Sequence, residues 1–193
     1  MLVLVVGPSG AGKDTLLDRA RAELSGSPGF RFVRRTITRP AQAGGEDHEA
    51  ITRTAFEARR DAGGFALWWE AHGLLYGLPA DILQDFEQRR ISVANVSRAM
   101  IADAAARFAV HVVEITAPPE VLAARLAARG RESAADVAGR LARQVALPPE
   151  VPVTTIMNDG TAEQGAARLL AVLLSLAAQP VRPERNPSPV RSG

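Results

Sequence analysis

Short apolar runs alternate with longer amphipathic stretches along the chain. The first run, 2–6, is entirely apolar and rich in valine, which is typical of a strand buried on both faces of a sheet. After a glycine-rich segment, Leu16, Leu17, Ala20 and Leu24 recur with the period of a helix. The pattern predicts strands at 2–6, 30–38, 91–96, 110–116 and 153–157, short strand-like pieces within 65–76, and helices at 13–24, 55–62, 79–89, 97–108, 118–128, 133–145 and 161–178.

Strands that alternate with helices of 10–15 residues indicate βαβ units. The sequence therefore predicts an α/β fold, in which helices flank a mostly parallel sheet. We expect one domain over 1–178. The remaining segment, 179–193, has four prolines and no apolar periodicity, which predicts a disordered tail.

Composition and charge exclude several classes of protein. The chain has no cysteine, so it can form neither a disulfide nor a thiolate metal site. Its net charge of +2 equals the excess of Arg182, Arg185 and Arg191 over Glu184 in the tail, and aromatic residues make up only 5%, which argues against a nucleic-acid partner. No apolar run could span a membrane, and 2–6 is too short for the core of a signal peptide, so we expect a cytoplasmic protein.

The glycine-rich segment carries the strongest chemical signal. Gly7-Pro8-Ser9-Gly10-Ala11-Gly12-Lys13 follows a buried strand and opens a helix, which is the context of a P-loop for nucleotide phosphates. Glycines let backbone N–H groups surround phosphate oxygens, and the helix N-terminus adds its positive end. Lys13 is the only lysine among 23 basic residues, so the sequence predicts ATP binding at 7–13, with Lys13 catalytic.

The residue after the lysine departs from the usual motif. A Ser or Thr normally stands there and its hydroxyl binds Mg²⁺, but this chain has Asp14 followed by Thr15. A carboxylate can hold Mg²⁺ directly or through water. Both residues are candidates for ATP and Mg²⁺ binding, and the sequence does not decide between them.

The order of motifs over 2–175 resembles the guanylate kinase family. Besides the P-loop, the similar segments are Thr36-Ile37-Thr38-Arg39-Pro40, Phe65 with Gly73-Leu74-Leu75-Tyr76-Gly77, Arg129-Gly130-Arg131-Glu132 with Arg140-Leu141, and Asn158-Asp159. The resemblance implies a P-loop NTPase-type fold with a small acceptor-binding subdomain at about 35–80 and a lid at about 129–140. It also implies an acceptor phosphate on Arg39, Arg35 and Tyr76, ATP contact by Asn158, and catalytic Arg129, Arg131 and Arg140.

The residues that would read a guanine base are missing. Leu67 and Leu78 stand where that family has a glutamate and a hydroxyl residue, and a site without its polar partners rejects a base that needs them. A narrower family fits better on Arg34–Pro40, Gly45–Glu49, Tyr76–Pro79, Asn95–Arg98 and Asn158–Gly160. These segments resemble the ribose 1,5-bisphosphate phosphokinases of bacterial phosphonate degradation, which implies that ATP phosphorylates a small phosphorylated acceptor, ribose 1,5-bisphosphate, to 5-phosphoribosyl 1-diphosphate.

Two other functions remain open at this stage, and so does the oligomeric state. The chain could be a nucleoside monophosphate kinase with another base, or a catalytically silent guanylate-kinase-like module that binds a peptide. His48 could contact the sugar or be satisfied by its neighbours. Glu46 and Asp47 could hold acceptor hydroxyls or Mg²⁺, or be solvated.

The lid assignment leads to a first prediction. Arg131→Ala is expected to lower the turnover number by several orders of magnitude, since a guanidinium that stabilises charge on the transferring phosphoryl group would be lost. Steady-state kinetics beside a circular dichroism spectrum of the variant would measure this. A near-wild-type rate would remove Arg131 from the mechanism.

Overall fold

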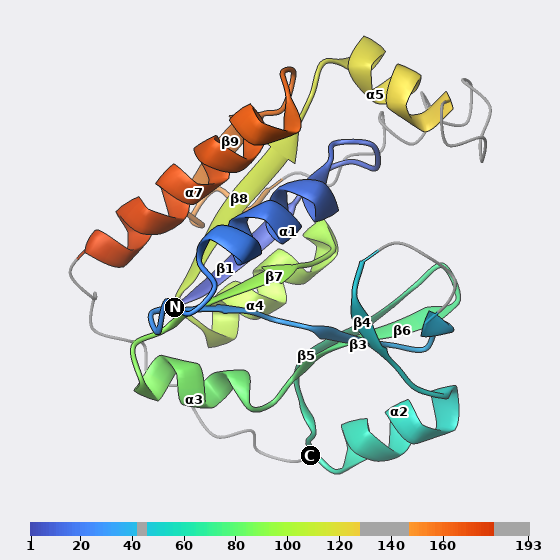
Figure 1. Cartoon of the computed structure of the whole chain (residues 1–193). Helices are drawn as coiled ribbons and strands as arrows, with labels where there is room; N and C mark the ends of the chain where they lie inside the picture. The colour runs from blue at the N-terminus through green and yellow to red at the C-terminus, as the bar shows by residue number, and fades with distance from the viewer. Residues whose placement is uncertain (42–45, 128–146, 180–193) are drawn as a thin grey trace. The chain divides into compact units, whose positions relative to one another are not determined.

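A five-stranded sheet forms the centre of the fold in a computed structural model, which describes residues 1–41, 46–127 and 147–179 (Figure 1). Its order is β2 (Phe30–Phe32), β7 (Ile91–Asn95), β1 (Leu2–Val6), β8 (Val110–Thr116) and β9 (Val153–Met157). The pairs β2–β7 and β8–β9 are parallel. All five residues of β1 are buried, as expected for a central strand.

Helices lie along this sheet. They are α1 (Lys13–Glu23), α4 (Ile101–Arg107) after the 3-10 turn η2 (Arg98–Met100), and α7 (Ala162–Ala178). Helix α5 (Pro119–Ala127) follows β8 beyond the end of that strand (Figure 1). α1 packs beside α7, where Arg19 and Glu163 form an ion pair of 2.7 Å, and α4 packs against β8 (Figure 1). The predicted α/β architecture is confirmed. Thr161 starts α7 with a capping box, since its hydroxyl accepts from the Gln164 N–H and the Gln164 side chain accepts from the Thr161 N–H.

A second, four-stranded sheet has the order β4 (His48–Ala50), β3 (Arg35–Ile37), β6 (Leu74–Pro79) and β5 (Phe65–Ala71). β5 and β6 form an antiparallel hairpin, and its two-residue turn, His72-Gly73, has positive φ at both positions. Helix α2 (Arg53–Asp61) packs on β5 through Phe56, whose ring centre lies 4.4 Å from that of Phe65. Helix α3 (Ile82–Glu87) follows β6.

The chain divides into two compact units. One contains Met1–Val3 and Gly26–Ala94, and the other contains the described residues of Leu4–Ser25 and Asn95–Gly193. The four-stranded sheet belongs to the first unit, and the P-loop belongs to the second. Among the residues that the structure describes, no helix is both long and apolar enough to cross a membrane.

Several predicted elements need correction. The single strand expected at 30–38 is two strands, because β2 pairs with β7 while β3 pairs with β4 and β6 in the other sheet. Strand β4 lies in a segment that the sequence analysis left without structure. The helix predicted at 55–62 begins earlier, at Arg53, because Thr52 caps α2 and its hydroxyl accepts from the Ala55 N–H at 3.2 Å. The helix predicted at 133–145 lies outside the described residues.

A buried carboxylate connects three elements of the first unit. Asp85 of α3 is 2% exposed. It accepts hydrogen bonds from the Ser92 hydroxyl at 2.8 Å, from Arg31 at 3.3 Å and from Arg90 at 3.4 Å. Because a buried carboxylate is costly without partners, this set fixes α3 against β2 and β7.

Removing the Asp85 carboxylate is therefore expected to destabilise the protein. Asp85→Ala should lower the free energy of unfolding by about 3 kcal/mol, since it leaves the buried Ser92 hydroxyl without its acceptor and removes a carboxylate partner from Arg31 and Arg90. Asp81→Ala is the matched control, because Asp81 pairs with the same Arg31 at 2.8 Å but is 54% exposed, and it should cost less than about 1 kcal/mol. Urea unfolding of both variants measures the difference, and equal costs would contradict the role given to Asp85.

Candidate active site

The segment between β1 and α1 adopts a backbone conformation that favours glycine. Gly7, Gly10 and Gly12 have φ values of 148°, 85° and 87°, which side-chain-bearing residues rarely adopt. Such a backbone turns successive N–H groups towards one side, where they can bind an anion. The structure thus gives 7–12 the form that the sequence motif predicts.

Each of these glycines also lies against a different neighbour. A Cβ on Gly7 would lie 1.9 Å from the Ile115 carbonyl oxygen of β8. A Cβ on Gly10 would lie 3.1 Å from Leu126 of α5, and one on Gly12 would lie 2.6 Å from the Asn158 amide nitrogen. The loop is therefore held by close contacts that leave no room for a methyl group at Gly7.

Lys13 reaches back across the loop from the first position of α1. Its ammonium nitrogen donates to the carbonyl oxygens of Gly7 at 2.8 Å and Pro8 at 3.0 Å. No side chain caps the start of α1, so the positive end of the helix faces the loop without a competing side-chain acceptor. Ser9 at the tip of the loop is exposed, and Ala11 is buried. Cation, helix end and glycine backbone together suit a polyphosphate.

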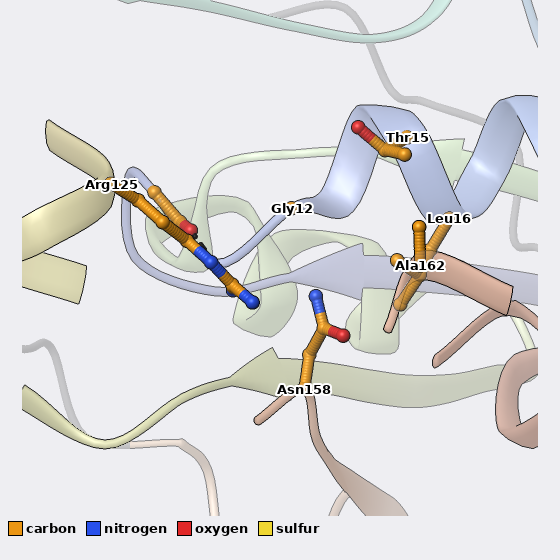
Figure 2. A pocket seen from close by; sticks show the side chains of 7 residues that line it. Gly12, Thr15, Leu16, Arg125, Asn158 and Ala162 are labelled. Atoms are coloured by element: carbon orange, nitrogen blue, oxygen red, sulfur yellow. Dashed lines mark hydrogen bonds between the residues drawn. The ribbon is translucent and has the colours of Figure 1, made fainter. Parts of the chain in front are cut away.

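A pocket of about 360 Å³ opens beside the loop, and its walls include Gly10, Gly12, Thr15, Leu16, Arg125, Asn158 and Ala162 (Figure 2). Arg125 and Asn158 approach it from α5 and from the segment after β9. The Arg125 guanidinium donates to the Gly10 carbonyl at 3.5 Å. The sequence analysis missed Arg125. Its place was only weakly indicated in the sequence: Arg125 follows Leu122 by three positions, which puts both residues on the same face of α5, and Leu122 is buried.

Asn158 is held by its surroundings in one orientation. It is 3% exposed, its backbone N–H donates to the Thr116 carbonyl at 2.7 Å, and its amide NH₂ donates to the Ala11 carbonyl at 2.8 Å. The amide oxygen is buried and has no hydrogen-bond partner among the described residues. The side chain lines the pocket with its oxygen turned towards Gly165 of α7 and its NH₂ group towards Gly12. The predicted contact of Asn158 with a nucleotide stays a prediction.

The two candidates for metal binding face different surroundings. The Thr15 side chain is exposed and lines the pocket, whereas an Asp14 carboxylate oxygen accepts from the Asn95 amide at 2.9 Å. Within the described part of the chain, no group of three or more histidine, aspartate or glutamate side chains forms a metal site by itself. A metal at this loop would thus depend on ligands that the nucleotide supplies, as Mg²⁺ commonly does.

The predicted acceptor residue Arg35 already has partners within the first unit. Its guanidinium forms a two-pronged ion pair with Glu46, and the two side chains are 11% and 17% exposed. The same guanidinium lies 5.8 Å from the ring centre of Trp69 and 5.3 Å from that of Tyr76, and the two rings stack on each other. Arg35 and the predicted Tyr76 are therefore neighbours. Glu46, whose role the sequence left open, is the ion-pair partner of Arg35.

Arg39 lies close to a buried histidine. His48 is 4% exposed, and its ring nitrogens lie 3.0 Å from the Glu46 carbonyl oxygen and 3.1 Å from that of Arg39. A terminal nitrogen of Arg39 lies 3.4 Å from the same ring. His48 is thus satisfied by its neighbours, one of the two readings that the sequence allowed. The Arg39 Nε is buried without a hydrogen-bond partner in the described residues.

The two leucines that replace base-reading residues lie in the core. Leu67 and Leu78 pair across β5 and β6 and are 1% and 0% exposed. Beside them, the Thr36 hydroxyl donates to Glu49 at 2.7 Å, which lowers the pKa of that carboxyl group together with the nearby Arg59. In the second unit, burial lowers the pKa of His111. The predicted Arg129, Arg131 and Arg140 lie outside the described residues.

The fold and the loop define the class of protein. A solved guanylate kinase from Anaplasma phagocytophilum superposes with a TM-score of 0.65 over 93% of this chain and 87% of its own, at 16% identity, so the two share a fold. The molecule has the guanylate kinase fold and carries a P-loop between β1 and α1. No protein-family model matches the chain.

Sequence comparison narrows the class to one family. A ribose 1,5-bisphosphate phosphokinase of Acidiphilium cryptum is 50% identical over 182 residues, which cover 94% of this chain and 97% of that protein. A bifunctional ribose 1,5-bisphosphokinase-thymidine phosphorylase of Cupriavidus necator is 51% identical over 171 residues, where the match spans 88% of this chain and 28% of the longer relative. The chain belongs to the family of ribose 1,5-bisphosphate phosphokinases.

The tight contact at Gly7 gives a prediction for nucleotide binding. Gly7→Ala is expected to weaken binding of the ATP analogue AMP-PNP by at least about 100-fold, because its Cβ would collide with the Ile115 carbonyl and displace the loop. Isothermal titration calorimetry measures the affinity. Gly29→Ala is the control, since no atom lies within 4 Å of its Cβ position, and it should bind like the wild type. Unchanged affinity in Gly7→Ala would show that the loop conformation is not required.

Proposed function

We propose that this protein transfers the γ-phosphoryl group of ATP to ribose 1,5-bisphosphate and releases ADP and 5-phosphoribosyl 1-diphosphate. The observation that carries the proposal is the P-loop that holds the Lys13 ammonium across Gly7 and Pro8, in a chain 50% identical to a ribose 1,5-bisphosphate phosphokinase. The loop favours a triphosphate donor. We infer the acceptor, ribose 1,5-bisphosphate, from the activity for which that relative is named.

The nucleotide would lie along the loop and the adjoining pocket. N–H groups at the start of α1 and the Lys13 ammonium would meet the β- and γ-phosphates. Asn158 and Arg125 line the pocket, and the planar Arg125 guanidinium is a cation on which an adenine ring could stack. Mg²⁺, when bound with ATP, supplies further neutralisation of phosphate charge. Asp14 and Thr15 are the residues of this loop that could hold it.

The acceptor would present an oxygen of its C1 phosphate as the nucleophile. This oxygen is already anionic, so the transfer needs no general base. The new bond forms from that oxygen to the γ-phosphorus while the bond from phosphorus to the bridging oxygen of ADP breaks. The chain's task is to bring anionic groups together, which calls for cations and fixed donors.

Arg35, Arg39 and Tyr76 are the candidates for holding the acceptor phosphates. A guanidinium can bind two phosphate oxygens at once, and the tyrosine hydroxyl can donate one further bond. Glu46 occupies the edge of the Arg35 guanidinium formed by Nε and Nη2, so a phosphate that binds this edge must displace Glu46. The Arg39 Nε has no hydrogen-bond partner in the described residues. Leu67 and Leu78 fill space with apolar side chains, which agrees with an acceptor that has no base. Arg129, Arg131 and Arg140 remain candidates for neutralising the transferring group.

A panel of acceptors tests the proposal. The protein is incubated with Mg-ATP and, separately, ribose 1,5-bisphosphate, ribose 5-phosphate, GMP, AMP or UMP, and phosphorus NMR identifies the products. We expect a new diphosphate only with ribose 1,5-bisphosphate. Lys13→Ala should reduce this rate by about 100-fold or more, because the cation at the transferring phosphate is lost.

Two outcomes would contradict the proposal in different ways. Transfer to GMP would mean that buried leucines at 67 and 78 are compatible with base recognition, so the protein would be a nucleoside monophosphate kinase. Binding of ATP without transfer to any acceptor on the panel would contradict the proposed reaction and favour a module that binds without catalysis.

A further inference from the structure

The Asp14 side chain is held by Asn95, a residue to which the sequence analysis gave no role. One oxygen of its carboxylate, Oδ1, accepts a hydrogen bond from the Asn95 amide nitrogen at 2.9 Å. Both side chains are half-buried and belong to the second unit. The interaction joins positions that are 81 residues apart, so it is a feature of the fold and not of the local sequence.

The backbone explains why Asn95 is close to the P-loop. Asn95 is the last residue of β7, and the next N–H, that of Val96, donates to the Val5 carbonyl at 3.1 Å. Val5 and Val6 end β1 immediately before Gly7. The carboxyl end of β7 thus lies beside the start of the phosphate loop, at the edge of the sheet where ligands of α/β proteins bind.

The chemistry of this pair is the reverse of the common P-loop arrangement. Usually a Ser or Thr hydroxyl of the loop and an Asp at the end of a neighbouring strand hold Mg²⁺ together. Here the loop supplies the carboxylate, Asp14, and the strand end supplies a neutral amide, Asn95. The site therefore still has one negative charge, but it lies on the loop and not at the end of the strand. Two carboxylates at this distance would repel each other, so an amide is the partner that suits Asp14.

We propose that Asn95 is a positioning residue for magnesium binding: its amide holds Asp14 Oδ1, so that the second oxygen, Oδ2, is directed to the Mg²⁺ of bound Mg-ATP. Thr15, the other candidate, lies in the wall of the pocket. The inference rests on the use of Mg-ATP in the proposed function and is independent of the acceptor.

The Mg²⁺ dependence of nucleotide binding tests this directly. Binding of AMP-PNP is measured by calorimetry over a range of Mg²⁺ concentrations and also in EDTA, without any acceptor. Asn95→Ala should raise the Mg²⁺ concentration for half-maximal binding by about tenfold, as expected when a residue that orients a metal ligand is lost, and should leave the affinity in EDTA unchanged. Asn158→Ala is the contrast, because it should weaken binding equally with and without Mg²⁺.

Combined variants separate positioning from a general structural effect. In an Asp14→Asn background, adding Asn95→Ala should change the Mg²⁺ requirement by less than about twofold, because residues that act through one another have non-additive effects. Asp14→Ser alone should lose most of the Mg²⁺ dependence. The exchanged pair Asp14→Ser with Asn95→Asp should regain it, since it restores the common hydroxyl–carboxylate arrangement.

Several results would overturn the inference. One is an equal loss of affinity with and without Mg²⁺ in Asn95→Ala. Another is additive effects of Asn95→Ala and Asp14→Asn. A third is no recovery of the Mg²⁺ dependence in the exchanged pair, when its thermal unfolding matches that of Asp14→Ser. Wild-type protein that failed to bind AMP-PNP would instead contradict ATP use in the proposed function, and this inference with it. Wild-type binding with an unaffected Asn95→Ala variant would contradict only the inference.

Discussion

The backbone of 7–12 must come so close to its neighbours that its key positions have to be glycine. Gly7 faces a carbonyl of β8, Gly10 faces a leucine of α5, and Gly12 faces the Asn158 amide. These contacts come from three separate parts of the second unit. The anion-binding shape of the loop is therefore imposed by the surrounding fold. This preorganisation matters because donors that are already aligned need no reorganisation when a phosphate arrives.

The pattern of apolar and polar residues predicted those strands that correspond to one continuous run in the sequence. Strands β1, β8 and β9 were predicted to the residue, since each is a continuous run with apolar residues and clear ends. The pattern failed where pairing is decided at a distance. Residues 30–38 look like one strand, yet the chain changes sheets between Phe32 and Arg35. Strand β4 reads His48-Glu49-Ala50, and no polarity pattern reveals that it pairs with β3.

The same distinction holds for the candidate site. The sequence identified 7–13 because the residues that form a phosphate-binding loop are consecutive in the chain. Arg125 and Asn95 were not given roles, because their significance comes from contacts with Gly10 and Asp14 over long stretches of chain. The partner of Arg35 could not be foreseen either. The sequence predicted Arg35 as a cation that holds an acceptor phosphate, but in the structure Glu46 and two aromatic rings contact its guanidinium.

The Arg35–Glu46 pair bears on which acceptors the first unit can accept. A phosphate that binds the Nε and Nη2 edge of Arg35 must replace a carboxylate that already binds there through two oxygens. Coulomb attraction grows with the product of the charges, so a phosphate dianion competes with a carboxylate better than a monoanion does. The displaced Glu46 side chain also loses a largely buried partner, which raises the cost of binding a weakly charged ligand. An ion pair at this position thus favours acceptors rich in phosphate charge, and ribose 1,5-bisphosphate, with two phosphate groups, meets that requirement without any contact to a base.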